Sequence, residues 1–223
     1  AYKNQHHMKK IIFISLLFSL LITNVCYSQY SSQQIDSIMG VAMDKYNVAG
    51  VAVAIVKDGK IIHSKGYGVK SSVTKSPVNN HTNFAIASNS KAFTAAALAI
   101  LVEEGKITWQ DKVKSHIPEF KMYNPYVTEN FNIQDLLAHR SGLGLGIGDL
   151  MFFPDGSSFT IDDLLSSFQH FKPVSAFRTK FDYDNLLYLV AGEVIKRVSG
   201  MSWEDFISER IFQPLNMDNS YAS

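Results

Sequence analysis

Cysteine is nearly absent from this chain of 223 residues, in which Cys26 is the only one. A single thiol cannot form an internal disulfide or a cysteine-based metal site, so packing alone must hold the fold. The chain also lacks an excess of either charge, because its 21 Lys and Arg residues nearly balance its 20 Asp and Glu residues. Metal-ligand spacing is absent among the scattered histidines, and we expect no metal and no cofactor from His63, His81, His116, His139 and His170.

The hydrophobic stretch near the N-terminus is too short for a full membrane span. Met8 and two lysines precede IIFISLLFSLLITNV, and small residues follow near Cys26 and Ser28. This pattern predicts a secretory signal peptide over residues 8–28. Asn24-Val25 lacks the small residues of a lipid-attachment site, which disfavours a lipoprotein. We therefore expect an exported protein, periplasmic or secreted, with no membrane span after cleavage.

Residues 1–7 precede Met8 and have the character of read-through or vector-derived sequence, so they are left out of the fold. Removal of residues 1–28 leaves 18 basic and 20 acidic residues, a net charge of −2. Nothing in that balance attracts nucleic acid or an anionic membrane. The expected partner is a small-molecule or peptide substrate, and the oligomeric state is left open.

The mature part, residues 29–223, begins with a pattern for a helix and a β-hairpin. Residues 33–46 place Ile35, Ile38, Val41 and Ala42 on one apolar face of a helix. Two strand-like runs over residues 51–56 and 60–69 are joined by Asp58-Gly59, a strong two-residue hairpin signal. A single hairpin is marginally stable, so we expect further strands beyond residue 223 and interpret the chain as C-terminally truncated.

The remainder is predicted to be mostly helical. The expected helices cover residues 92–102, 131–140, 160–171, 186–198 and a last one from Ser202 to before Pro214. The predicted fold class is therefore α+β or α/β: the N-terminal helix and hairpin of a mixed domain, with a mostly helical domain after them.

Ser88 and Lys91 are the first candidate catalytic pair. They lie one helical turn apart at the start of the apolar run AFTAAALAILV, so hydroxyl and amine project from one face. A sheltered lysine can take the proton of a serine nucleophile. The pattern S-x-x-K also occurs at Ser72–Lys75 in a polar stretch, and a helix-capping serine with a surface lysine explains any such tetrad equally well.

Tyr183 and Asn185 form the second candidate group, at the entry to the helix over residues 186–198. A phenol near an ammonium loses its proton more readily, so Tyr183 could accept the serine proton. Asn185 could hold a substrate amide or tie down the lysine. A core-facing tyrosine and a helix-capping asparagine are the alternative interpretation.

Taken in order, residues 83–120, 133–143 and 177–217 resemble the serine beta-lactamase-like family, and specifically its class C, DD-peptidase and esterase branch. The resemblance covers residues 33–223 and implies a beta-lactamase/transpeptidase-like fold. Its first motif corresponds to Ser88 and Lys91, and its second to Tyr183 and Asn185. The tyrosine distinguishes this branch from class A, which has S-D-N there.

The resemblance implies that Ser88 attacks a carbonyl and forms an acyl-enzyme, with Lys91 and Tyr183 sharing the role of general base. Asn185 would bind substrate, and the Ser88 N–H would hold the oxyanion. A third motif, K-T-G or a histidine variant, does not follow Asn185. Residues 29–223 alone are therefore expected to be nearly inactive. The candidate substrates are a beta-lactam, a D-amino-acid peptide or an ester; a non-catalytic penicillin-binding or sensor module is the alternative.

Two further signals are set aside at this point. The glycines at 142, 144, 146 and 148 lack the G-x-G-x-x-G spacing of a phosphate-binding loop and are interpreted as a mobile loop near the cleft mouth. His139-Arg140 lies at a predicted helix end, where positive charge is favourable, and is interpreted as structural.

Overall fold

The computed structural model describes residues 30–153, 156 and 158–222. It divides into two compact units, Ala1–Thr82 and Asn83–Ser223. The upstream residues 1–7 and the predicted signal peptide 8–28 lie outside the described residues. Among the residues that are described, no helix combines the length and the hydropathy that a membrane span requires.

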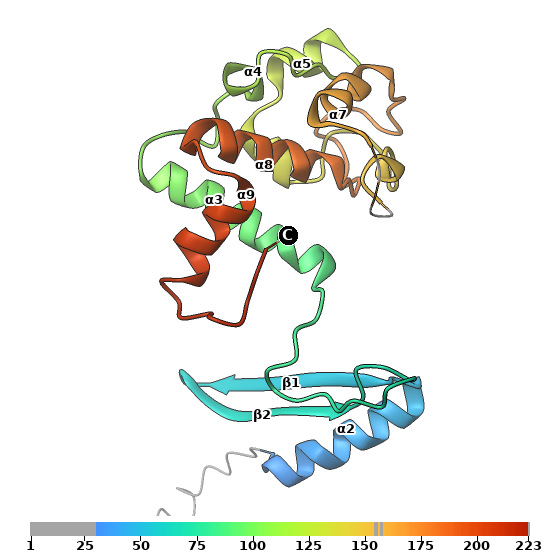
Figure 1. The fold of residues 1–223 in the computed structure, drawn as a ribbon. Coiled ribbons are helices and arrows are strands. Elements are labelled where there is room, and N and C mark those ends of the chain that lie inside the picture. Colours follow the sequence, from blue (N-terminus) through green and yellow to red (C-terminus); the bar gives the residue numbers. More distant parts are fainter. Residues whose placement is uncertain (1–29, 154–155, 157, 223) are drawn as a thin grey trace, which may run out of the picture. The chain divides into compact units, whose positions relative to one another are not determined.

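The first unit consists of helix α2 (Ser32–Tyr46) and an antiparallel hairpin of β1 (Gly50–Lys57) and β2 (Lys60–Gly68) (Figure 1). Asp58 and Gly59 both have positive φ, 48° and 72°, as a tight two-residue hairpin turn requires. The register runs from Lys57 opposite Lys60 to Gly50 opposite Gly68, with an irregularity between Ile55 and Val56. The sequence prediction of a helix followed by this hairpin is confirmed.

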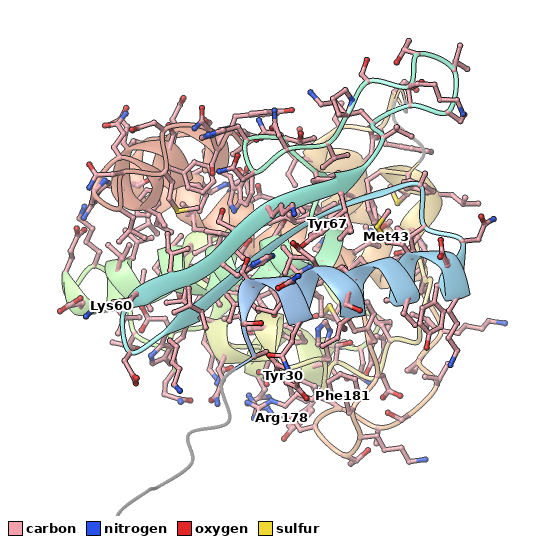
Figure 2. The ribbon with its side chains drawn as sticks, turned by 90° about the horizontal axis from the view of Figure 1, so that it is seen from below. Tyr30, Met43, Lys60, Tyr67, Arg178 and Phe181 are labelled. Carbon is pink, nitrogen blue, oxygen red and sulfur yellow. The ribbon has the colours of Figure 1, made fainter. Side chains whose placement is uncertain are left out.

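A chain of hydrogen bonds joins α2 to β2. His63 Nδ1 lies 2.8 Å from Ser32 Oγ, and its Nε2 lies 2.7 Å from Tyr67 Oη. Tyr67 donates to Asp36 Oδ1 at 2.7 Å, and Lys65 donates to Asp36 Oδ2 at 2.9 Å. Figure 2, a view from below, shows α2 running along the hairpin, with Tyr67 labelled on β2. Polar contacts therefore fasten this helix to the sheet.

The apolar face predicted for this helix is only partly buried. Ile35 is 6% exposed, whereas Ile38 and Val41 are 49% and 66% exposed. The helix itself is nevertheless well defined at its ends. Ser31 and Gln34 form a capping box at the N-terminus, and Asn47 adopts the left-handed conformation at the C-terminus.

The second unit is helical. Its longest helices, α3 (Ser90–Glu103) and α8 (Leu186–Ser199), pack against each other and bury residues of both in the core (Figure 1). Leu98 and Leu101 of α3 and Val190 and Val194 of α8 are fully buried. The helices between them in the chain are α4 (Val113–His116), α5 (Pro125–Asn130), α6 (Ile133–Leu137) and α7 (Ile161–Ser167).

Several boundaries in this unit differ from those predicted. Helix α6 ends at Leu137 and not at Arg140, because His139 has a φ of 52° and cannot continue a right-handed helix. The short helices α4 and α5 were not predicted. The last helix begins after Ser202 as expected, but it is a short α-helix, α9 (Trp203–Ile207), continued by the π-helical segment η4 (Ser208–Phe212). Helix α8 ends at Ser199, one residue beyond the predicted end, and Gly200 follows it in the left-handed conformation.

Candidate active site

Ser88 lies in a tight turn immediately before α3. The turn is a 3-10 segment, η1 (Ala87–Asn89), and α3 begins at Ser90. Ala87 has a φ of 44°, a left-handed conformation that costs a residue with a Cβ roughly 1–2 kcal/mol. Asn89 Nδ2 braces the turn by donating to Ile86 O at 2.9 Å. Ser88 is an exposed residue in the described structure.

Two groups from the predicted motifs converge on the Ser88 hydroxyl. Tyr183 Oη lies 2.7 Å from Ser88 Oγ, although 95 positions separate them in the chain. Lys91 Nζ donates to the same oxygen at 3.3 Å. The serine proton can pass to either group in its deprotonated form, the phenolate of Tyr183 or the uncharged amine of Lys91. The four-residue S-x-x-K pattern at Ser72–Lys75, by contrast, lies in an exposed loop of the first unit.

Asn185 holds the lysine. Lys91 Nζ donates to Asn185 Oδ1 at 2.7 Å, the shortest of its hydrogen bonds described here. Asn185 Nδ2 in turn contacts both carboxylate oxygens of Asp149, at 3.2 and 3.1 Å. A carboxylate can only accept hydrogen bonds, so it fixes the amide with its nitrogen toward Asp149 and its oxygen toward Lys91. Of the two roles considered for Asn185, tying down the lysine is the one this geometry displays.

The positive charge of Lys91 changes the titration of the phenol. The pKa of Tyr183 is lowered below its usual range, first by its interaction with Lys91 and then by the hydrogen bond with Ser88, against the opposing effect of burial. Lys91 Nζ also lies 4.9 Å from the ring centre of Tyr183 and 5.2 Å from that of Tyr188. At a given pH, a larger fraction of Tyr183 is therefore phenolate, the form that accepts a proton, than of an isolated tyrosine.

His139 packs beneath the phenol. Its ring stacks on the Tyr183 ring with centroids 4.4 Å apart and planes inclined by 25°. Its Nδ1 accepts a hydrogen bond from the backbone N–H of Asp184 at 3.1 Å. Burial and the nearby Lys91 lower the pKa of His139. The helix end expected at His139-Arg140 lies earlier, at Leu137, and Nδ1 of His139 is an acceptor in this contact.

Asp184, between the two motif residues, is buried in an unusual state for a carboxyl. It is 1% exposed, and its Oδ1 accepts from the backbone N–H of Leu187 at 3.2 Å. Its Oδ2 has no hydrogen-bond partner among the described residues. Burial raises the pKa of Asp184 to about 7. Near neutral pH this group therefore exists in both protonation states.

A buried carboxylate clamps the segment that leads to Tyr183. Asp135 is fully buried and accepts from Arg140 Nε and from Arg178 Nη2, each at 2.6 Å. The backbone N–H of Arg178 also donates to Arg140 O at 2.7 Å.

In α3, Thr94 Oγ1 accepts from Trp203 Nε1 at 3.0 Å and joins α3 to α9. These contacts fix the two segments that carry the reacting groups.

The four residues predicted from the motifs, Ser88, Lys91, Tyr183 and Asn185, thus lie together in the second unit. Sequence reasoning missed Asp149 and assigned no part in the site to His139. A signal for Asp149 lay in the glycine-rich stretch: Gly148 has a φ of 71° and a Cβ there would lie 2.1 Å from Leu186. This glycine permits the turn into η2 (Asp149–Met151) that presents Asp149 to Asn185.

Acidic and histidine side chains do not gather into a possible metal site. No group of three or more His, Cys, Asp or Glu among the described residues could hold a metal ion. Lys91, which contacts Ser88, is linked to Asp149 through Asn185. The chemistry that this arrangement offers is proton transfer to and from a serine hydroxyl.

The chain was compared with known proteins. A family model described as Beta-lactamase matches residues 35–223. Protein flp of Staphylococcus aureus (strain MW2) is 32% identical over 193 residues, which is 85% of this chain and 38% of that protein.

Two solved structures are similar as well. The octameric penicillin-binding protein homologue from Pyrococcus abyssi has a TM-score of 0.71 at 28% identity, covering 83% of this chain and 43% of its own. A class C beta-lactamase has a TM-score of 0.71 at 26% identity, covering 84% and 49%. The predicted beta-lactamase/transpeptidase-like fold is confirmed, and the chain spans less than half the length of each of these relatives.

Proposed function

The chain belongs to the beta-lactamase family, and from that membership we propose that it is a serine hydrolase that forms an acyl-enzyme on Ser88. The observation that carries the proposal is the contact of one hydroxyl with two proton-handling groups. Ser88 Oγ lies 2.7 Å from Tyr183 Oη and 3.3 Å from Lys91 Nζ. The family membership supports the same pair of motifs as the reacting groups.

In the first step Ser88 Oγ attacks the carbonyl carbon of the substrate and gives up its proton. Tyr183 is the closer acceptor, and its lowered pKa supports this role. Lys91 as the ammonium stabilises the phenolate electrostatically, whereas Lys91 as the uncharged amine would take the serine proton itself through its contact with Ser88 Oγ. The proton then passes to the leaving group, the carbon–leaving group bond breaks, and the acyl group stays on Ser88.

In the second step a water molecule releases the acyl group. Tyr183 as the phenolate, or Lys91 as the uncharged amine, takes the water proton; the oxygen of that water attacks the acyl carbon, the bond from this carbon to Ser88 Oγ breaks, and the proton returns to Ser88 as the acid leaves. The Ser88 N–H, at the turn before α3, is the proposed oxyanion donor. Asn185 holds Lys91 in place by accepting its hydrogen bond and is also the proposed contact for a substrate amide.

The proposed substrates are a beta-lactam, a D-amino-acid peptide or an ester. Support comes from two of the relatives, a penicillin-binding protein homologue and a class C beta-lactamase. Export to the periplasm or the exterior follows from the predicted signal peptide at residues 8–28, and residues 29–223 form the proposed hydrolase domain. That residues 29–223 alone are nearly inactive stays a prediction, so the assays use the protein as its gene encodes it.

Covalent labelling tests the proposal. A fluorophosphonate and a fluorescent penicillin are each incubated with the wild type and with Ser88→Ala. The amount of labelled protein is then quantified by gel electrophoresis. Ser72→Ala is the matched control, because it alters the other S-x-x-K serine. We expect labelling that Ser88→Ala abolishes and Ser72→Ala retains. Labelling that persists in Ser88→Ala would show that Ser88 is not the nucleophile.

A second variant tests the proton acceptor. Tyr183→Phe keeps the ring and removes the oxygen, so the rate of labelling should fall by about 10²–10⁴ while the protein stays folded. A wild type that binds the fluorescent penicillin reversibly, with no covalent product from either probe, would instead indicate the non-catalytic binding or sensor module.

A further inference from the structure

We propose that His139 is the positioning residue that holds Tyr183 against Ser88, through one stacking contact and two backbone hydrogen bonds on either side of the tyrosine. The inference rests on the proposed function, because it assigns His139 to the proton acceptor of that reaction. His139 touches neither Ser88 nor Lys91 in any hydrogen bond described here, so it would act through Tyr183.

The two hydrogen bonds bracket the tyrosine. The carbonyl oxygen of His139 accepts from the backbone N–H of Asp182 at 2.7 Å. The ring Nδ1 of His139 accepts from the backbone N–H of Asp184 at 3.1 Å. One residue therefore fixes the chain immediately before and immediately after Tyr183, and its left-handed φ of 52° turns carbonyl and ring toward the same segment.

The stacking contact fixes the plane of the phenol. The rings of His139 and Tyr183 are 4.4 Å apart and nearly parallel. Phe181 meets the His139 ring edge-on at 5.2 Å, and Tyr188 lies at 5.4 Å from it. The His139 side chain is 8% exposed, so these neighbours leave it little freedom. A phenol whose plane and backbone are both held keeps its oxygen at 2.7 Å from Ser88.

The bond to Asp184 requires an uncharged ring. A backbone N–H can only donate, so Nδ1 must carry a lone pair and the proton of the neutral ring resides on Nε2. The titratable groups that face the ring are Lys91, Tyr183, Tyr188 and the buried carboxyl of Asp184. Protonation of His139 in acid would remove the acceptor and add a second cation near Lys91.

Two substitutions separate the parts of this role. His139→Asn removes the stacked ring but keeps an amide acceptor and tolerates a positive φ. His139→Phe keeps a ring and removes the acceptor. His170→Asn, at an exposed histidine of the same unit, is the matched control. The rate of fluorophosphonate labelling should fall at least tenfold in both His139 variants and stay within twofold of the wild type in His170→Asn.

The phenol itself supplies a readout that does not depend on activity. The pKa of Tyr183 is measured by ultraviolet absorbance as the difference between each protein and the same protein carrying Tyr183→Phe. Because contacts with Lys91 and Ser88 lower this pKa, loss of positioning should raise it toward the usual value near 10. Folded His139 variants that leave the phenol pKa unchanged overturn the inference, even if labelling slows.

If the variants do not fold, two measurements on the wild type test the inference. Nuclear magnetic resonance of the histidine ring should show the proton on Nε2 at neutral pH, and labelling should slow as His139 takes up a second proton in acid. A proton on Nδ1 at neutral pH would contradict the inference. A wild type that neither probe labels would defeat the proposed function, while the phenol titration would still test His139.

Discussion

Asp149 and Asn185 are joined so that one amide nitrogen faces both oxygens of the carboxylate, at 3.2 and 3.1 Å. The contact bridges 36 positions of the chain and links the glycine-rich stretch to the second motif. It fixes the direction of the amide, whose oxygen then accepts from Lys91 at 2.7 Å. The position of the ammonium near Ser88 thus depends on a residue that does not contact Ser88.

Replacement of Asp149 by alanine should slow acylation without unfolding the protein. The freed amide of Asn185 can turn its nitrogen toward Lys91, and a charged hydrogen bond is worth about 1.5–3 kcal/mol, which corresponds to a slowing of roughly 10- to 100-fold. The rate of fluorophosphonate labelling measures the effect. Asp162→Ala, at an exposed acid in α7, should label at the wild-type rate; equal rates for the two variants would refute the role of Asp149.

Replacement of Asp135 by asparagine should destabilise the helical unit. The buried carboxylate accepts from Arg140 and Arg178, and loss of its charge leaves both guanidinium groups without their anion. We expect a loss of about 3 kcal/mol in the free energy of unfolding, measured by urea denaturation. The exposed Asp218→Asn should change that free energy by less than about 0.5 kcal/mol. A similar small change in Asp135→Asn would show that the clamp is not important for stability.

Asp184 should make the protein less stable as the pH rises from 4 to 8. Its folded-state pKa of about 7 exceeds the usual 3.8. The stabilisation that this group contributes is therefore complete below pH 4 and is lost as the pH rises through 7. Asp184→Asn keeps the oxygen that accepts from Leu187 and cannot ionise. Relative to the wild type, this variant should gain on the order of 4 kcal/mol across that range.

Urea denaturation of wild type and Asp184→Asn at several pH values measures this difference. The other carboxyl groups are common to both proteins, so their titration cancels in the difference. A difference that stays constant between pH 4 and pH 8 would mean that Asp184 titrates like an ordinary surface carboxyl.

Tyr67 should stabilise the first unit up to pH 10 and lose that effect above it. Burial and the hydrogen bond to Asp36 raise the pKa of Tyr67 to about 12. Since the folded-state pKa is above the unfolded value of 10, the stabilisation is complete below pH 10 and disappears as the pH passes through 12. Tyr67→Phe should therefore be less stable than the wild type at pH 8, with a difference that narrows between pH 10 and 12.

Circular dichroism during urea denaturation measures that narrowing. Tyr46→Phe is the control, because Tyr46 is 71% exposed. The control should have nearly the same free energy of unfolding as the wild type at pH 8. A constant difference for Tyr67→Phe as well would indicate that the bond to Asp36 contributes nothing to the titration.

The features predicted correctly from sequence are set by neighbours in the chain. The pair Asp58-Gly59 predicts the hairpin because few pairs of neighbouring residues both adopt a positive φ angle. The predicted end of the helix over residues 186–198 lies within one residue of the observed end of α8, where Gly200 adopts the left-handed conformation. The spacing of Ser88 and Lys91 brings the two together, although Ser88 proves to lie in a 3-10 turn and not in α3 itself.

The features that sequence reasoning missed depend on contacts between distant segments. Helix α6 ends at Leu137, and His139 shortly after it is left-handed. The carbonyl and the ring of His139 accept hydrogen bonds from residues more than forty positions later in the chain. In the sequence, Asp149 looks like any acidic residue of a loop, because its contact with Asn185 exists only in the folded chain. The elevated pKa of Asp184 follows from burial, which its polar neighbours in the sequence conceal.

Every hydrogen bond to Ser88 Oγ and Lys91 Nζ described above comes from residues 83–223. The proposed nucleophile and its proposed proton acceptor therefore belong to the helical unit. Substitutions confined to residues 30–82 remove none of these hydrogen bonds. A family member can therefore diverge there without losing the contacts around its serine.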